Sequence, residues 1–153
     1  MKKISKLFLV ALIAGLSALT VSCTYPENNW FSLKSPEYRL IGTWQITDSY
    51  LNGEAVDSTN EYHANDVGAY FYFYPDYVLN VMTIYNGQIR QSTYGTWYFQ
   101  NKNKELVLDF TILGKHYSYV ADIKKFSNKE LFYEYDDRNG NHWRLEMYSR
   151  TAY

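Results

Sequence analysis

The stretch from Gln88 to Phe126, QIRQSTYGTWYFQNKNKELVLDFTILGKHYSYVADIKKF, decides the fold. Apolar and polar residues alternate along it in three runs, 88–100, 105–113 and 115–126, and short segments of turn residues separate the runs. This alternation is typical of half-buried β-strands, in which successive side chains point to opposite faces. Because connections this short join neighbouring strands, we expect three consecutive antiparallel strands.

The same pattern continues on both sides of this stretch. Further strands are predicted at 41–50, 67–74, 77–85, 129–136 and 142–150. Turn chemistry separates the strands at Pro75-Asp76, Asn86-Gly87, Gly114, Ser127-Asn128 and Asn139-Gly140. The two Asn-Gly steps favour type I′ hairpins, and only the connection 51–66 is long. The sequence therefore predicts an all-β fold, an eight-stranded antiparallel up-and-down β-barrel, which removes its strand edges by closing.

Strand alternation also divides the side chains into an inward and an outward set. The predicted inward set is Gly42, Trp44, Ile46, Phe71, Phe73, Leu79, Val81, Gly95, Trp97, Phe99, Leu106, Leu108, Phe110, Ile112, Tyr117, Tyr119, Ala121, Ile123, Leu131, Tyr133, Tyr135, Trp143, Leu145 and Met147. Large side chains come from nearly every strand. We expect the end of the barrel around Trp44 and Trp97 to be packed solid, because small inward residues are few and Gly42 and Gly95 sit beside these indoles.

The N-terminus has the pattern of a bacterial lipoprotein precursor. Three lysines precede an apolar run from Leu7 to Leu19, which is shorter than the roughly 20 residues of a membrane-spanning helix. A stretch of small residues then leads to Cys23, the only cysteine of the chain. We predict a signal peptide at 1–22 and lipidation of Cys23; an ordinary cleaved signal followed by a free thiol is the alternative. A lone cysteine cannot form an internal disulfide, and lipidation would account for it.

The rest of the chain has the length and composition of one domain. Residues 23–37 contain turn and breaker residues without periodicity and are predicted to be a lipidated tether, and residues 38–153 the barrel domain. Removing the signal peptide leaves 12 Lys and Arg against 16 Asp and Glu, a net charge near −4. No basic stripe is present, so nucleic acid is not an expected partner. Aromatic residues make up 19% of the chain and 17 of them are tyrosines, a composition that favours strands.

Several short motifs resemble the lipocalin-like lipoproteins of Gram-negative bacteria. These are Gly42-Thr43-Trp44 at the first strand, the second Gly95-Thr96-Trp97, the long first loop and the closing segment 143–150. The resemblance implies a small barrel that holds an apolar or amphipathic ligand. It also implies a basic residue near the C-terminus that packs across the first-strand tryptophan; Arg150 is the candidate, although its parity matches the outward set. Since Thr24 is not an aspartate, the resemblance further implies an outer-membrane location, facing either the periplasm or the surface.

The sequence shows no established motif for catalysis or for metal binding, although the polar residues of the 51–66 loop could hold a divalent cation. The three histidines, His63, His116 and His142, show no ligand spacing, and no cysteine is available to join them. The polar residues of the long loop miss the EF-hand pattern. We therefore expect a protein that is not an enzyme and needs no cofactor or metal.

Two binding functions remain. In the first, the barrel has a shallow pocket under the 51–66 loop, and four inward tyrosines offer polar handles to an apolar or amphipathic ligand: Tyr117, Tyr119, Tyr133 and Tyr135. Core filling by the same tyrosines is an equally weighted alternative. In the second, the barrel is a solid scaffold that recognises a protein or glycan through an outer aromatic stripe, Tyr70, Tyr72 and Tyr74.

Overall fold

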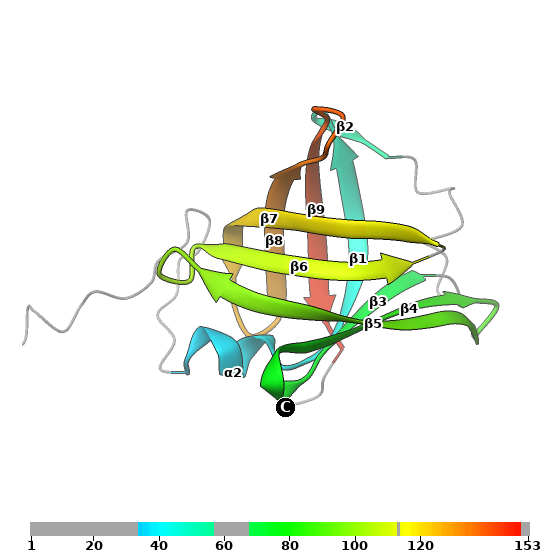
Figure 1. Ribbon diagram of the computed structural model, residues 1–153, viewed down its shortest axis with the longest axis horizontal. Coiled ribbons are helices and arrows are strands. Elements are labelled where there is room, and N and C mark those ends of the chain that lie inside the picture. The colour runs from blue at the N-terminus through cyan, green and yellow to red at the C-terminus, as the bar shows by residue number, and fades with distance from the viewer. Residues whose placement is uncertain (1–33, 57–67, 113, 151–153) are drawn as a thin grey trace, which may run out of the picture.

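The computed structural model describes residues 34–56, 68–112 and 114–150, and it is almost entirely β (Figure 1). Its elements are a short helix α2 (Pro36–Leu40), a 3-10 turn η1 (Pro75–Tyr77) and the strands β1 (Gly42–Leu51), β2 (Glu54–Ala55), β3 (Gly68–Phe73), β4 (Val78–Tyr85), β5 (Gln88–Gln100), β6 (Glu105–Ile112), β7 (Lys115–Phe126), β8 (Glu130–Asp136) and β9 (His142–Ser149). The predicted strands at 88–100 and 115–126 agree with β5 and β7, and the other boundaries agree within one residue.

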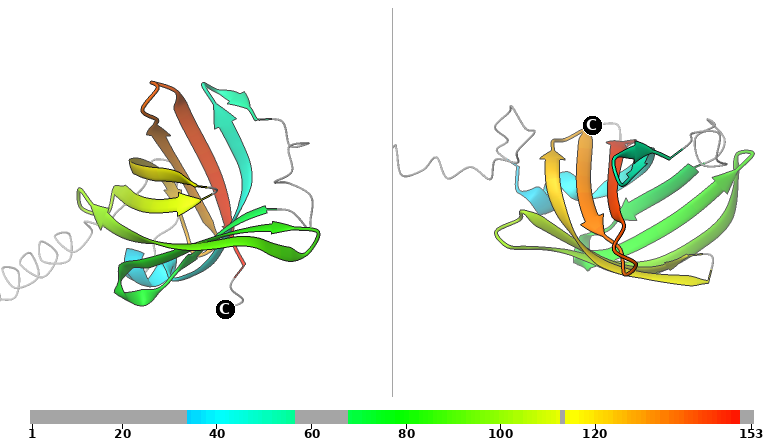
Figure 2. Two further views of the ribbon diagram at one scale, coloured as in Figure 1. Left: turned by 45° about the vertical axis from the view of Figure 1, so that its right-hand side comes forward. Right: turned by 90° about the horizontal axis from the view of Figure 1, so that it is seen from above.

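The strands form one closed antiparallel barrel. They follow the order β1-β3-β4-β5-β6-β7-β8-β9, and β1 also pairs with β9, which closes the ring of eight. The two-residue strand β2 pairs with the end of β1. Figure 2 shows the sheet curling round so that β5–β7 lie across from β1. The predicted all-β, eight-stranded antiparallel fold is confirmed.

The core contains the side chains that alternation assigns to the inside. Trp44 is fully buried and Trp97 nearly so, and both belong to one continuous apolar cluster with residues from every long strand. Each predicted inward residue other than the two glycines lies in this cluster or packs against it. The periodicity of two therefore gives the correct face throughout.

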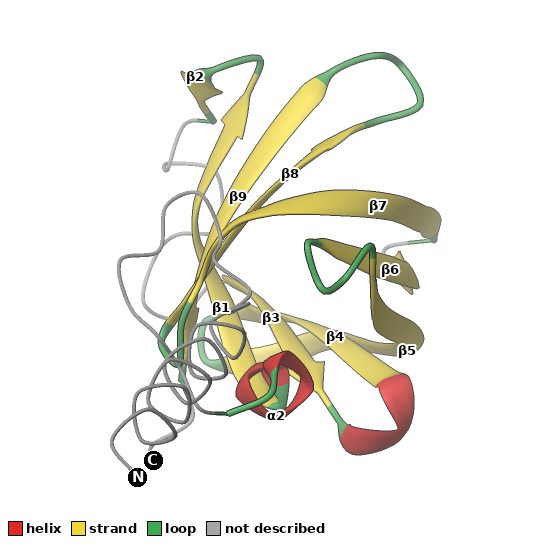
Figure 3. Ribbon diagram, turned by 90° about the vertical axis from the view of Figure 1, so that its left-hand side faces the viewer, coloured by secondary structure: helices red, strands yellow, loops and turns green. Residues whose placement is uncertain are grey.

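Helix α2 covers the end of the barrel opposite β2 (Figures 1 and 3). This helix was not predicted from the sequence. Ser35 caps the helix by accepting a hydrogen bond from the Tyr38 backbone N–H at 3.3 Å, and Pro36 supplies the fixed φ that suits the first helical position. Leu40 is fully buried, and its carbonyl accepts a hydrogen bond from Trp44 Nε1 at 2.8 Å. The helix is held in place by these contacts with the core.

The cation beside this end of the core is Arg39, so the expectation for Arg150 is wrong. Arg39 is buried, its Nη1 donates to the Phe126 carbonyl at 3.0 Å, and its guanidinium lies 4.5 Å from the centre of the Phe126 ring. That ring packs against Trp44, with centroids 6.2 Å apart. Arg150 instead donates from Nε to Gln45 Oε1 at 2.7 Å, on the outward face of β1, as its parity requires.

Three connections differ from their predicted form. Residues 75–77 form a 3-10 turn with Asp76 at φ 61°, so the strand predicted from Tyr77 begins at Val78. The Asn86-Gly87 step has positive φ at both residues, as a type I′ turn requires, whereas at Asn139-Gly140 only the glycine does. The β8–β9 turn is not type I′ because the Asp137 side chain organises a longer loop. Within the predicted 51–66 loop, β2 forms a short hairpin with β1.

The end opposite α2 is less completely paired. β1 pairs with β3 only from Gly42 to Gln45, and β7 pairs with β8 only between Asp122 and Phe126. Residues 46–49 of β1 and the first half of β7 therefore have ladder partners on one side only among the described residues. The barrel widens at this end, which we call the mouth.

Candidate ligand-binding pocket

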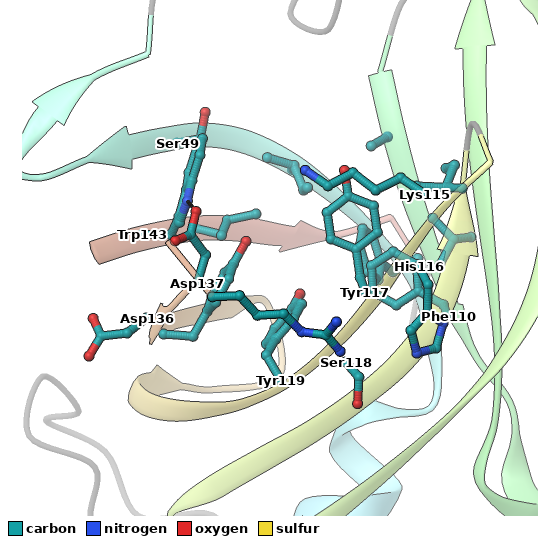
Figure 4. A pocket seen from close by; sticks show the side chains of 18 of the residues that line it. Ser49, Phe110, Lys115, His116, Tyr117, Ser118, Tyr119, Asp136, Asp137 and Trp143 are labelled. Carbon is teal, nitrogen blue, oxygen red and sulfur yellow. Dashed lines mark hydrogen bonds between the residues drawn. The ribbon is translucent and has the colours of Figure 1, made fainter. Parts of the chain in front are cut away.

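A pocket of about 530 Å³ opens at the mouth of the barrel (Figure 4). Its lining comes from β1, β3, β4, β6, β7, β8, β9 and the β8–β9 turn. It extends inward to Phe71 and Val81, which are buried core residues. The volume is within the range of about 300–1,000 Å³ that small-molecule sites occupy. The hollow lies at the end where the sequence analysis places it, and it reaches deeper than the shallow pocket expected there.

Stacked aromatic rings form much of the wall. Phe110 and Tyr117 stack with centroids 5.2 Å apart, and Tyr119 stacks on Tyr135 at 3.8 Å. Antiparallel register brings Phe110 directly opposite Tyr117. All four rings line the pocket, so three of the four tyrosines predicted as ligand contacts reach it.

The fourth predicted tyrosine, Tyr133, lies behind this wall. It is fully buried in the core, and its hydroxyl is 3.2 Å from that of Tyr119. Tyr133 thus fills the core, as the alternative for the tyrosines proposes, and it supports a side chain that borders the pocket.

Three of these hydroxyl groups, those of Tyr119, Tyr133 and Tyr135, are neutral at ordinary pH. Burial raises the pKa of Tyr133 from its usual 10.0 to about 12. Burial is also the main reason that the pKa values of Tyr119 and Tyr135 are raised, and the neighbouring tyrosines add to the effect. Each is therefore a hydrogen-bonding group in an apolar wall and is a poor proton acceptor in catalysis.

Asp137 organises the β8–β9 side of the mouth. Its Oδ1 accepts hydrogen bonds from the backbone N–H groups of Asn139 and Asn141 at 2.8 and 3.0 Å. Its Oδ2 accepts from Asn141 Nδ2 at 3.0 Å and from Trp143 Nε1 at 3.2 Å. These hydrogen bonds lower the pKa of Asp137 to about 2, and the bond from the Asn141 side chain contributes most. Trp143, predicted as a core residue, packs against the core and also lines the pocket in this orientation.

Two cationic residues at the rim of the pocket were not predicted from the sequence. Lys115 lines the pocket at the start of β7, and Arg138 does so from the β8–β9 turn. Lys115 Nζ lies 5.1 Å from the centre of the Tyr117 ring. Their positions in the sequence could have indicated this role, since both residues adjoin turns at the same end of the predicted barrel. Only the closed register shows that they surround one opening.

The remaining predicted fold residues lie at the opposite end. Trp97 is 1% exposed, and its Nε1 donates to the carbonyls of Tyr74 and Val78 at 3.1 Å. Phe73 and Phe99 pack edge-on against its ring. Gly42 begins β1 with φ 131°, and Gly95 lies against the backbone of β6. Cys23 lies outside the described residues, as does most of the long loop.

The outer aromatic stripe of the second binding function is only partly exposed. Tyr70 and Tyr72 are half-buried, and Tyr74 is 38% exposed. Tyr72 and Tyr74 pack together, with ring centroids 4.7 Å apart. This contact leaves less of the two rings for a partner.

The described residues contain no candidate metal cluster and no candidate membrane-spanning helix. In the ranges 34–56, 68–112 and 114–150, no group of three or more His, Cys, Asp or Glu side chains could hold a metal ion. No helix in this part of the chain is both long and apolar enough to cross a membrane.

Comparisons with known proteins give likenesses of structure only. No family model matches the chain, and no curated protein matches it. Among solved structures, a redesigned β-barrel matches with a TM-score of 0.47 and 16% identity, over 79% of this chain and 99% of that one. A second redesigned β-barrel, bound to DFHBI, matches with a TM-score of 0.47 and 15% identity, over 76% of this chain and 100% of that one. At this identity the likeness concerns the barrel fold alone.

Proposed function

We propose that this protein is a membrane-anchored, lipocalin-like binding lipoprotein that holds a small apolar or amphipathic molecule in the mouth of its barrel. The observation that supports the proposal is the pocket of about 530 Å³ with its wall of stacked rings. Ligand sites are mostly apolar, with a few polar groups that fix the orientation of the ligand. Tyr117, Tyr119 and Tyr135 supply both the apolar area and the hydroxyls.

The two ends of the barrel differ in a way that supports a single entrance. Leu40 and Arg39 of α2 are buried against one end, where Trp44 and Phe126 fill the interior. The mouth has incomplete strand pairing and polar turns instead. A ligand would therefore enter through the mouth and rest on the aromatic wall.

Dye binding tests the ligand proposal. The full chain in phosphatidylcholine vesicles should enhance the emission of a neutral, environment-sensitive apolar dye above that of protein-free vesicles. Ala69 lines the pocket on β3, so Ala69→Phe should narrow the hollow and weaken the protein-dependent signal. Tyr94→Ala, on an outer side chain that is 70% exposed, is the matched control and should bind dye normally. A barrel that takes up no dye would overturn the ligand function and favour the outer-surface alternative.

The anchor is proposed from the N-terminal sequence and has its own test. Acyl chains on Cys23 would hold the protein to a membrane, since each buried methylene contributes about 0.8 kcal/mol. Cys23→Ser should release the protein from the membrane fraction without unfolding the barrel, because the anchor and the barrel are separate along the chain. Continued retention that only detergent reverses would contradict the lipidation of Cys23.

A further inference from the structure

Four charged side chains border the pocket, two cationic and two anionic. Lys115 and Arg138 are the cations, and Asp136 and Asp137 are the carboxylates. In Figure 4 Lys115 lies on one side of the pocket, and the two aspartates lie on the other. The charge of the ligand that the pocket can bind depends on which of these four groups is not already paired within the protein.

Both carboxylates already have partners. A carboxylate offers about four acceptor positions, and Asp137 receives four hydrogen bonds from the backbone and side chains of its own hairpin. Asp136 accepts from His142 Nδ1 at 2.8 Å, and its side chain is 74% exposed on the outward face of β8. Neither aspartate is placed to bind the cationic end of a ligand in the pocket.

The two cations, in contrast, have no carboxylate partner among the described residues. Among the described residues, Lys115 contacts the Tyr117 ring and makes no ion pair, and Arg138 has no ion pair or hydrogen bond through its side chain. Lys115 also shares the inward face of β7 with Tyr117 and Tyr119, because these positions alternate along the strand. Its ammonium group therefore stands at the end of the aromatic wall.

We propose that the pocket takes an amphiphile with one anionic end, which Lys115 and Arg138 bind at the rim while the apolar body lies on the rings of Phe110, Tyr117 and Tyr119. This inference rests on the proposed ligand function and specifies its ligand class. An ammonium and a guanidinium at the water-exposed rim can bind a carboxylate with little loss of their own hydration. The apolar body leaves water at the same time, so the two contributions act together.

Displacement of the neutral dye by a matched pair of ligands tests the inference. Dodecanoate and dodecanol share one alkyl chain and differ in charge. Wild-type protein should bind the acid more tightly than the alcohol. Lys115→Gln combined with Arg138→Gln should weaken binding of the acid about tenfold and leave binding of the alcohol unchanged. A tenfold loss is expected if the lost contacts contribute about 1.4 kcal/mol. Partitioning into the vesicles is the same for every variant and cancels in this comparison. Added salt should reduce the preference of the wild type, because the rim charges are exposed to solvent.

Lys129→Gln is the matched control. It removes an exposed lysine at the β7–β8 turn, on the α2 end of the barrel, and should leave the preference for the acid intact.

A rigid ring acid and its neutral alcohol, measured in parallel, distinguish a ligand with an alkyl body from one with a polycyclic body while testing the same rim. Normal dye binding with equal displacement by acid and alcohol, or a preference that survives the double substitution, would overturn the inference and leave the ligand function standing. Loss of dye binding in the wild type would overturn the ligand function itself.

Discussion

Trp44 shows how one side chain can fasten two elements at the α2 end of the barrel. Its ring is fully buried against Phe126, and its indole N–H is bonded to the carbonyl of Leu40 in α2. The Gly42-Thr43-Trp44 motif identifies this residue as a core tryptophan from sequence. The sequence does not identify the acceptor of its N–H, because a five-residue helix leaves no periodic pattern to detect.

Trp44→Ala should lower the free energy of unfolding by about 3–5 kcal/mol, as expected when a large core side chain is truncated. Tyr72→Ala should cost much less, because that ring is half-buried on the outer face. Denaturant unfolding of the two variants checks the difference. Similar losses would mean that the assignment of inner and outer faces is wrong.

Gly95 is a second residue whose role depends on its surroundings. A Cβ at this position would clash with the Asp109 carbonyl oxygen and lie 2.9 Å from the Phe110 Cα, which belong to the backbone of β6. Backbone in the middle of a barrel strand cannot move aside easily. The sequence predicts that space is needed beside Trp97, and the structure shows that the paired strand β6 takes that space.

Gly95→Ala should therefore destabilise the barrel by about 3 kcal/mol, at the upper end of the range for overpacking. Thr96→Ala changes the next residue, which is exposed, and should stay within about 0.5 kcal/mol of the wild type. Thermal unfolding of both variants measures the difference. A Gly95→Ala protein as stable as Thr96→Ala would show that β5 and β6 are not so close in solution.

At the scale of elements, the β8–β9 hairpin shows why turn prediction succeeded only in part. The Asn-Gly rule gives the correct turn at Asn86-Gly87, where these two residues alone connect β4 to β5. At 137–141 the Asp137 carboxylate binds two backbone N–H groups, and this local competition produces a longer loop. The loop then carries Arg138 to the rim and orients Trp143 in the pocket wall.

Asp137 should make this hairpin sensitive to acid. Its folded pKa of about 2 lies below the usual 3.8, so its contribution to stability is fully present above about pH 4 and is lost as the pH falls toward 2. Asp137→Asn should be less stable than the wild type at neutral pH, and the difference should shrink as the pH falls from about 4 to 2. Thermal unfolding followed by tryptophan emission reports it, since Trp143 is bonded to this carboxylate. A difference that does not vary with pH would contradict the prediction.

At the scale of the whole molecule, alternation and turn spacing predict eight strands, their order and their inward faces. They do not predict the register, because pairing of β1 with β9 joins residues about 100 positions apart. Register determines where the strands separate, and so it determines the depth of the mouth and the position of Lys115 beside the wall. The tyrosines of the pocket were therefore predictable by face, whereas the separation of Tyr133 from the other three was not.

The buried tyrosines should also make the whole barrel sensitive to alkali. The folded pKa of Tyr133 is about 12 and that of Tyr119 is raised well above 10.0, while both have a pKa near 10 in the unfolded chain. Stability should therefore be intact below about pH 10 and fall as the pH rises from 10 toward 12, because ionisation favours the unfolded state in that interval. All strands share one core, so we expect a single cooperative transition in which tyrosinate absorbance and far-UV circular dichroism change together.

Tyr133→Phe removes one of these ionisable groups and should make the loss of stability with rising pH shallower, whereas Tyr94→Phe, on an exposed ring, should not. Tyrosinate absorbance that develops fully near pH 10 with the circular dichroism unchanged would show that these hydroxyls are open to solvent in the folded barrel.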